Sequence, residues 1–494
     1  MLRSVKILVK AIALLLFVTG CTTRTLNLQN QVIEDEEALT KITAENVNGP
    51  IGLFHVIARA GSFNHTASIQ SLRLEYAKLQ AGISSLEVIP TLEASASSSM
   101  QDRNVGGSSA QLTNGVVQAN DNASYSVSSD RREQNGQLSV NLSIAQLGVA
   151  GLNSTISSQK ILVAAQEERS ALSELALRGV YLYWAALASQ KLERDINATL
   201  QDVSDAMSNS KEQLKFGLIE PLQALTVQRE LLSVSKSLRE LARSNSNSSI
   251  ELKQLVGVMP SEELELTTEN APNMLHLKRY EDDLVITTAI ANHSQYLTVF
   301  HESVALDAEE QKIFWDLLPQ VNLSVSSIYD DNPYKSENDW LEMRSVLSWN
   351  ILNALKLKPN LERVRLQKLI LEKQRQREFL NLVSLLQIAV EEVRQNEARL
   401  LLAKEYVSVS EKVLEQLEAQ ITSERATAIS VIKERQNLIQ AEFERDLIFA
   451  ELQESYFRLY FAMGLDLFPP NWKTLSPDEL PSALQNQFKR LAEL

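Results

Sequence analysis

The residues that most often carry chemistry are sparse in this sequence, and their spacing matches no catalytic or metal-binding motif. None of the five histidines stands in the HExxH spacing of zinc enzymes, and a single cysteine, Cys21, rules out a thiolate zinc site. Phosphate-binding glycine loops and the GxSxG motif of hydrolases are also missing. The acidic stretch Asp330–Glu342 resembles a calcium loop in charge alone, because it contains Pro333 and lacks the central glycine. We therefore expect no enzyme, no cofactor and no metal site.

Cys21 itself lies in a context that predicts a different chemistry. Basic residues near the start precede an apolar run, Ala11–Val18, and Gly20 stands directly before the cysteine. The run is too short to cross a bilayer as a stable helix, so residues 1–20 are typical of a secretory signal peptide. The pattern resembles the bacterial lipoprotein signal, which implies cleavage before Cys21 and lipid attachment to it. An ordinary signal peptide with an incidental cysteine is the alternative.

Composition and charge narrow the class of protein. Hydrophobic residues make up 44% of the chain and charged residues 22%, which is typical of a folded protein. The formal net charge is −14, and removal of the signal peptide takes away only positive charges. Because no basic stripe is present either, we expect no nucleic-acid partner.

The chain repeats itself. Similar landmarks recur in the same order and at similar spacing, namely Ile89–Ser98 with Leu318–Ser327, Ser139–Leu142 with Ser348–Ile351, and Leu255–Gly257 with Ala462–Gly464. A tandem duplication accounts for this order. We therefore divide the chain into a signal peptide (1–20), a lipid-anchored segment (21–60), a first repeat (61–257), a linker (258–279), a second repeat (280–464) and a C-terminal tail (465–494).

Each repeat contains a predicted β-hairpin, at about 89–145 and about 318–352. Apolar and small polar residues alternate along its strands, for example over 138–144 and 320–326. The loops between the strands are expected at Arg103–Gly136, which is rich in Ser, Asn and Gly, and at Asp330–Glu342. Alternation of this kind suits either a soluble half-buried sheet or a membrane barrel with a wet interior.

Two stretches predict unusually long helices. Ala145–Phe216 contains no proline, and Leu361–Thr422 contains neither proline nor glycine. At about 1.5 Å per residue, such a helix would reach roughly 105 Å, a length that favours coiled-coil-like packing. The strands add a constraint, because four strands per chain are too few to close a membrane barrel and open edges are not tolerated in lipid. If the strands cross a membrane, the chain must oligomerise.

Taken together, the signal peptide, the lipid-type cysteine, the duplication, the hairpins and the helical arms resemble the TolC/OprM outer-membrane efflux family. The local likenesses are Leu318-Pro319 before a strand, Leu347–Ile351, and Phe216-Gly217-Leu218 at a helix turn. The resemblance implies a mainly α protein with membrane β-structure: a homotrimer with a shared 12-stranded barrel and a long α-helical tunnel. It also implies an outer-membrane location with a periplasmic extension and a lipid anchor at Cys21.

In this family the turns between the long helices form a periplasmic tip, where an adaptor protein docks and an aperture opens. The resemblance implies that Gly217 and Leu218, in the first turn, are adaptor-docking residues. It implies the same for Ser423 and Glu424 in the second turn, although this turn lacks the glycine.

Many members narrow the aperture with acidic residues, which this sequence does not preserve. The matching aperture positions are Gln223, Ser430 and Lys433, with Arg425 beside them. Charged residues near the second turn would instead form a latch of ion pairs, involving Glu424, Arg425, Lys433, Glu434 and Arg435. The other interpretation of these residues is an ordinary solvated helix surface.

The resemblance implies a passive channel subunit of a tripartite efflux or export system, working with an adaptor protein and an inner-membrane pump. The outer-membrane component of type I protein secretion has the same architecture, and this sequence does not separate the two. A periplasmic coiled-coil lipoprotein without a pore is the alternative from another class.

Overall fold

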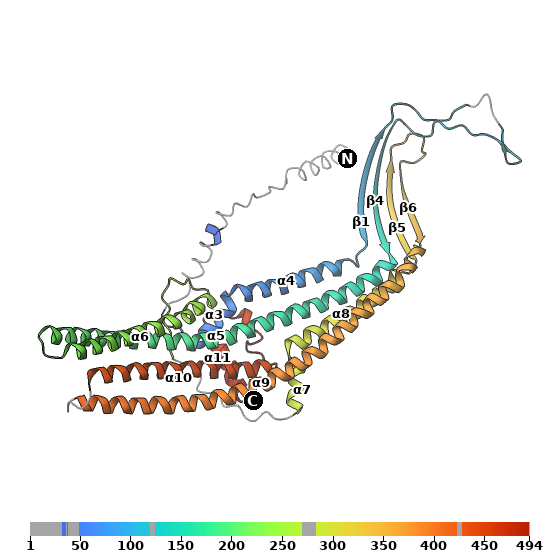
Figure 1. Cartoon of the computed structure of the whole chain (residues 1–494). Helices are drawn as coiled ribbons and strands as arrows, with labels where there is room; N and C mark the ends of the chain where they lie inside the picture. The colour runs from blue at the N-terminus through green and yellow to red at the C-terminus, as the bar shows by residue number, and fades with distance from the viewer. Residues whose placement is uncertain are drawn as a thin grey trace.

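The computed structural model describes residues 32–35, 37, 49–118, 124–268, 283–421 and 427–493. The chain is elongated, with a sheet at one end and two helical hairpins at the other (Figure 1). The predicted signal peptide and the lipid site Cys21 lie outside the described residues. Within these residues, none of the helices combines the length and the apolar character needed to cross a membrane.

The two halves of the chain repeat one order of elements. The first half consists of α3 (Leu53–Phe63), α4 (His65–Leu86), β1 (Thr91–Met100), β4 (Arg132–Ser143), α5 (Ile144–Lys215) and α6 (Pro221–Leu255). The second half consists of α7 (Asp283–Asn292), α8 (Ser294–Trp315), β5 (Gln320–Asp330), β6 (Asp339–Ser348), the short 3-10 helix η1 (Ile351–Asn353), α9 (Ala354–Ile421) and α10 (Ala428–Ala462). Helices α4 and α8 both have 22 residues, and α6 and α10 both have 35. The predicted tandem repeat is therefore visible in the fold.

The four long strands form one antiparallel sheet in the order β1-β4-β5-β6, so that β1 and β6 are its edges. Direct cross-strand neighbours share a face. One row across the sheet is apolar and consists of Leu92, Val140, Val325 and Met343. The next row, on the opposite face, is polar and consists of Glu93, Ser139, Ser326 and Glu342. In these central rows the predicted alternation gives one apolar and one polar side, while Ile328, Trp340 and Val346 add apolar side chains to the polar face.

The loop beyond the first hairpin differs from its prediction. Strand β4 begins at Arg132, inside the stretch predicted as loop, and a small hairpin, β2 (Leu112–Thr113) and β3 (Val116–Val117), forms within that loop. Asn114 and Gly115, at its turn, both have positive φ, at 53° and 78°. This Asn-Gly turn is a strong short-range hairpin signal. The loop composition, rich in Ser, Asn and Gly, concealed it.

The long helices agree closely with the first prediction and less closely with the second. Helix α5 runs over 72 residues, and α6 continues without a break through the polar run Ser244–Ser249. Helix α9 starts at Ala354, so the predicted start at Leu361 was wrong. Pro359 lies inside its second turn, where the missing N–H removes one backbone hydrogen bond and the following turns keep theirs.

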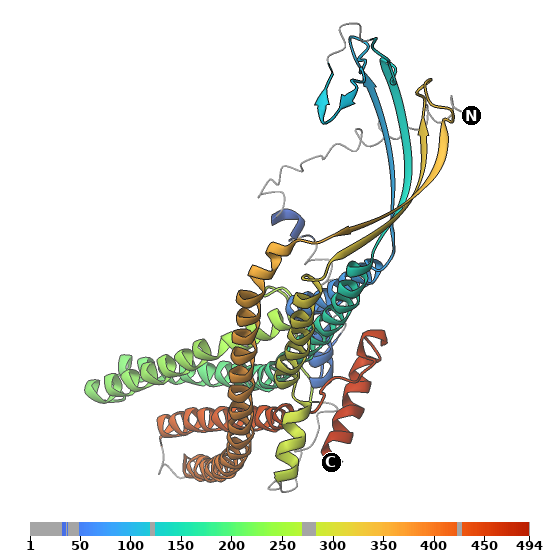
Figure 2. The same cartoon turned by 90° about the vertical axis from the view of Figure 1, so that its right-hand side faces the viewer.

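A large hydrophobic core lies where α3, α5, α9 and α10 meet, and residues of the C-terminal tail belong to it. Figure 2 shows the C-terminal helix, in red, beside the rest of the chain. After the 3-10 helix η2 (Trp472–Thr474), helix α11 (Leu480–Glu493) packs against α3. Phe488 of α11 lies between two rings, with centroid distances of 5.6 Å to Phe54 and 4.5 Å to Phe457. The tail therefore joins the first helix of the first half to the last helix of the second half.

A close contact near the sheet gives a first test of the packing. Gly148, early in α5, faces Trp315 at the end of α8, and a Cβ at Gly148 would lie 2.6 Å from the indole ring. We expect Gly148→Ala to destabilise the protein by about 1–3 kcal/mol, since the ring must move. Gly151→Ala is the control, because it meets no atom within 4 Å. Thermal unfolding should give a lower midpoint for Gly148→Ala than for Gly151→Ala; equal midpoints would contradict this packing.

His293 caps the N-terminus of α8 from a buried position. Its Nδ1 accepts a hydrogen bond from the backbone N–H of Gln295 at 3.4 Å, and its ring packs edge-on against Phe461. The imidazole is 1% exposed, and its Nε2 has no partner in the structure. Burial, together with the positive charge of Arg169, lowers the pKa of His293 to about 4. The folded protein thus keeps this group neutral at neutral pH.

This pKa predicts a loss of stability in acid. In the unfolded chain the imidazole of His293 binds a proton below its ordinary pKa of 6.5. In the folded chain it binds that proton only when the pH falls to about 4. The stabilisation is therefore complete above pH 6.5 and is lost by about pH 4, to the extent of about 3 kcal/mol. His293→Asn is the matched control, because Asn64 caps α4 in the first half without titrating. Thermal midpoints of the two proteins should diverge below pH 6.5, and parallel pH curves would refute the prediction.

Candidate functional site

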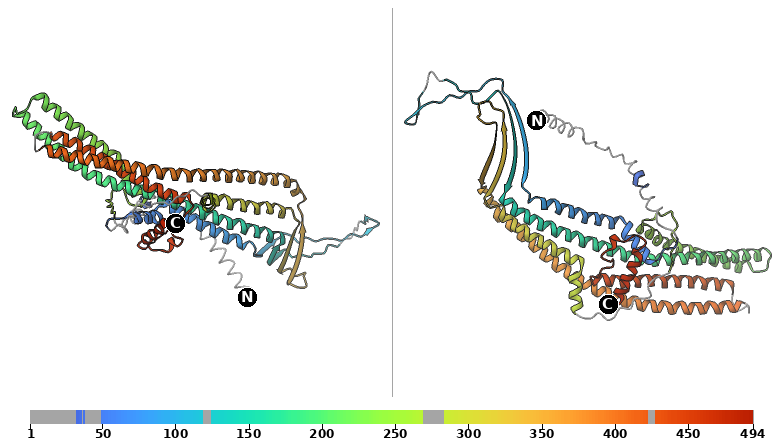
Figure 3. Two further views of the ribbon diagram at one scale, coloured as in Figure 1. Left: turned by 90° about the horizontal axis from the view of Figure 1, so that it is seen from below. Right: turned by 180° about the vertical axis from the view of Figure 1, so that it is seen from behind.

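The two helical hairpins, α5–α6 and α9–α10, run side by side away from the sheet (Figures 1 and 3). The turn of the first hairpin contains Gly217 at φ 68°, and the N–H of Leu218 donates to Gln213 O at 2.9 Å, which ends α5 in a Schellman motif. Phe216 and Leu218 are about 70% exposed there. The second turn, with the predicted Ser423, Glu424 and Arg425, lies outside the described residues.

The remaining aperture candidates occupy three different environments. Gln223 lines a cavity of about 560 Å³ between the hairpins. Ser430 lies in the first turn of α10, where its N–H donates to Oγ1 of the N-cap residue Thr427 at 3.3 Å. Lys433 is the one that joins the two hairpins, through an ion pair of 2.9 Å with Glu230 of α6. Whether these residues form an aperture stays a prediction.

Among the described residues near the tip, Arg435 is the one that pairs with two carboxylates. Its guanidinium pairs with Asp202 of α5 and, at 2.8 Å, with Glu418 of α9. Arg435 thus touches both hairpins from α10, while Glu434 only accepts a hydrogen bond from Asn437 in its own helix. The proposed latch of charge pairs therefore has two described members, Lys433 and Arg435.

Sequence reasoning did not identify the acidic partners of these cations. Asp202 lies 233 residues from Arg435, and Glu230 lies 203 residues from Lys433. Such pairs depend on how the hairpins pack, which spacing along one helix does not reveal. The same packing is apolar deeper in the bundle, where Val203, Leu231 and Ile432 share one hydrophobic cluster.

The site combines a cavity lined by both polar and apolar side chains with partly exposed ion pairs. The side chains of Arg435 and Asp202 are 36% and 43% exposed. A pair this exposed stabilises by only about 0.2–1 kcal/mol, so breaking the ion pair itself costs little. Among the described residues, no group of three or more His, Cys, Asp or Glu side chains is arranged to hold a metal ion.

The fold matches solved structures of outer-membrane channels. The Campylobacter jejuni CmeC outer membrane channel aligns with a TM-score of 0.66, covering 88% of this chain and 89% of that chain at 13% identity. The open state of the Neisseria gonorrhoeae MtrE outer membrane channel gives 0.62, with 84% and 89% covered at 15% identity. The outer membrane protein VceC from Vibrio cholerae gives 0.59, with 83% and 96% covered at 15% identity.

No protein-family model matches the sequence, and no curated protein matches it either. The likeness to solved structures nevertheless spans nearly the whole length of those chains. It agrees with the duplicated element order, the four-stranded sheet and the paired helical hairpins of this chain. At such low identity the likeness concerns the fold, and the chain has the fold of the TolC-type outer-membrane channels.

Proposed function

We propose that this protein is the outer-membrane channel subunit of a tripartite efflux or export system. The observation that supports this proposal is the sheet. Its apolar row is exposed, from 39% at Val325 to 80% at Met343, and its edge strands β1 and β6 pair with no other strand among the residues that the structure describes. An exposed apolar face is stabilised by an apolar surrounding such as lipid or a partner protein. An open strand edge has unpaired backbone N–H and C=O groups that can pair with another strand. Three copies pairing β6 to β1 would close a 12-stranded barrel with its apolar face in lipid.

The polar face of the sheet would then line a water-filled exit, and the helical hairpins would extend it into the periplasm. The lipid on Cys21 would hold the chain in the outer membrane, since several acyl chains anchor firmly. The channel itself would be passive. An inner-membrane pump would supply energy and substrate.

The tip of the hairpins would be the docking place of a periplasmic adaptor protein. Three apolar side chains, Phe216, Leu218 and Leu222, are about 70% exposed around the first turn. An apolar cluster this exposed favours a partner surface. Docking there would draw the hairpins apart by separating the ion pairs of Lys433 and Arg435. This proposal includes Gly217, Gln223 and Ser430 as neighbouring tip residues.

Strand-edge crosslinking tests the proposed assembly. Single cysteines along β1, from Leu92 to Ala96, would be combined with Met343→Cys on β6 in a Cys21→Ser background. We expect oxidation to join chains into a ladder that ends at three. Val140→Cys with Met343→Cys is the control, because the central strand β4 has both edges occupied. Monomeric particles with no crosslink at any β1 position would contradict the proposal.

A further inference from the structure

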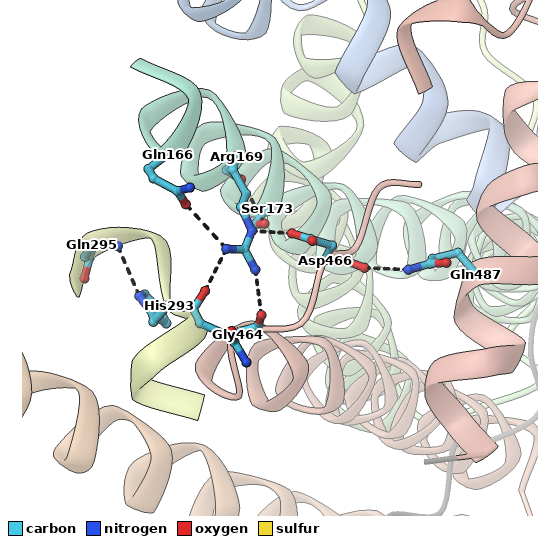
Figure 4. Close-up of polar contacts among 9 residues, drawn as sticks. Gln166, Arg169, Ser173, His293, Gln295, Gly464, Asp466 and Gln487 are labelled. Atoms are coloured by element: carbon cyan, nitrogen blue, oxygen red, sulfur yellow. Dashed lines mark hydrogen bonds and ion pairs between the residues drawn. The ribbon is translucent and has the colours of Figure 1, made fainter. Parts of the chain in front are cut away.

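The C-terminal ends of α7 and α10 meet at the side of α5, where one arginine binds both (Figure 4). Arg169 of α5 donates to the carbonyl of Asn292 at 2.7 Å and to the carbonyl of Gly464 at 2.6 Å. Its Nε also pairs with the carboxylate of Asp466. A single side chain of the first half therefore holds two helix ends of the second half.

The chemistry of this contact suits an arginine. Helix C-termini carry partial negative charge on unpaired carbonyls, which a nearby cation stabilises. A guanidinium is a rigid planar fork that can address three acceptors at once, whereas an ammonium is a point charge on a flexible stem. Gln166 Oε1 accepts from the same guanidinium at 3.4 Å, and Gln487 of α11 donates to the backbone carbonyl of Asp466 at 3.0 Å. We call the contact of Arg169 with Asn292, Gly464 and Asp466 the joint, and the tail is part of it through Gln487.

The first half closes its matching joint in another way. There the end of α6 is bound from its own repeat, by Asn64 Nδ2 on Leu255 O at 3.2 Å and by Arg59 Nε on Val256 O at 3.3 Å. Helix α7, the counterpart of α3, contains no arginine. In the second half the bond therefore crosses from one repeat to the other. This asymmetry is what distinguishes Arg169 from a general helix cap.

We propose that Arg169 is a positioning residue that sets the angle between the hairpins α5–α6 and α9–α10. Helix α10 has 35 residues and runs from this joint to the tip. At 1.5 Å per residue it is a lever of about 50 Å, so a rotation of about 5° at Gly464 moves its tip end by about 4 Å. Near that end, Lys433 and Arg435 bind α6 and α5. Cations thus fix α10 to the first half at both ends.

Distance measurement between spin labels at the tip tests this role. Labels would be placed at the exposed Leu222 of α6 and Ala428 of α10, in the full chain with Cys21→Ser. We expect Arg169→Gln to shift or broaden the label distance by about 4 Å, following the same lever arithmetic. Arg169→Lys should give an intermediate shift, because an ammonium replaces only part of the fork.

Arg178→Gln is the matched control. Arg178 lies on the same helix, is 60% exposed and pairs only with Glu251, at 3.0 Å. Thermal midpoints of all variants would be recorded on the same samples, so that a general loss of stability is separated from a change of angle. A label distance for Arg169→Gln equal to that for Arg178→Gln would overturn the proposal.

A second variant covers the case in which Arg169→Gln does not fold. Asp466→Asn removes one ionic arm and leaves both carbonyl contacts, so it should give a smaller shift in the same direction. The absence of that shift would also overturn the proposal. The functional meaning of the angle rests on the proposed channel, but the label distance does not require a pore. Failure of the channel and failure of the joint are therefore distinguishable.

Discussion

Replacing Arg435 by glutamate is expected to separate the two hairpins at the tip and to increase the conductance of the proposed channel. The new carboxylate would face Asp202 and Glu418, which Arg435 now binds. Loss of a partly exposed pair costs about 0.2–1 kcal/mol, and like-charge repulsion adds to it. At about 1 kcal/mol per chain, three chains would shift the closed state by about 3 kcal/mol, which is on the order of 100-fold.

The measurement is the open probability of reconstituted protein in a planar bilayer. Arg394→Glu is the control, because Arg394 is 71% exposed and pairs with Glu391 within α9. A double variant, Asp202→Lys with Arg435→Glu, should return the tip partly to its closed state, since only the contact with Glu418 stays repulsive. Equal open probabilities for Arg435→Glu and Arg394→Glu would show that this ion pair does not hold the tip.

Replacing Gly464 by alanine is expected to be the most damaging of the glycine substitutions. Gly464 has φ 69°, and a Cβ there would lie 2.8 Å from the carbonyl oxygen of Ala289 and 3.0 Å from the carbonyl carbon of Asn292. Left-handed backbone costs an alanine about 1–2 kcal/mol, and the backbone clash adds to this, for a total of about 3 kcal/mol. The last turn of α10 would move away from the α7–α8 junction.

Gly217→Ala separates the cost of the left-handed backbone from the cost of the clash with neighbouring backbone atoms. Gly217 has nearly the same φ, 68°, but nothing lies within 4 Å of its Cβ position, so only the backbone cost applies. Thermal unfolding should give a clearly lower midpoint for Gly464→Ala than for Gly217→Ala. Hydrogen exchange in the last turns of α10 should rise in Gly464→Ala alone. Equal midpoints and equal exchange for the two variants would contradict the close packing of Gly464 against Ala289 and Asn292.

Much of the fold follows from local pattern in the sequence. Period-two alternation predicted the strand faces, because the side-chain period in a strand is fixed and the register then places Val140 opposite Val325. The absence of proline predicted α5 almost to its ends, at Ile144 and Lys215. These are properties of single segments, and a segment carries them wherever it packs.

The contacts of the candidate site could not be predicted in this way. The partner of Arg435 lies 233 residues away, and its position depends on two long hairpins packing in register. The joint at Arg169 is harder still, since the duplication favours a bond within each repeat. The structure instead places Arg169 of the first half on Gly464 of the second. Distant pairing is a property of the packed chain, and no spacing rule reports it.

Single-channel recording of the purified, lipidated protein in a planar bilayer tests most directly whether this chain forms a channel. The proposed function predicts discrete conductance steps, with longer openings for Arg435→Glu. Silence of the unaltered protein alone would fit a closed tip. Silence of both the unaltered protein and Arg435→Glu would contradict the channel, and a periplasmic coiled-coil lipoprotein without a pore would take its place.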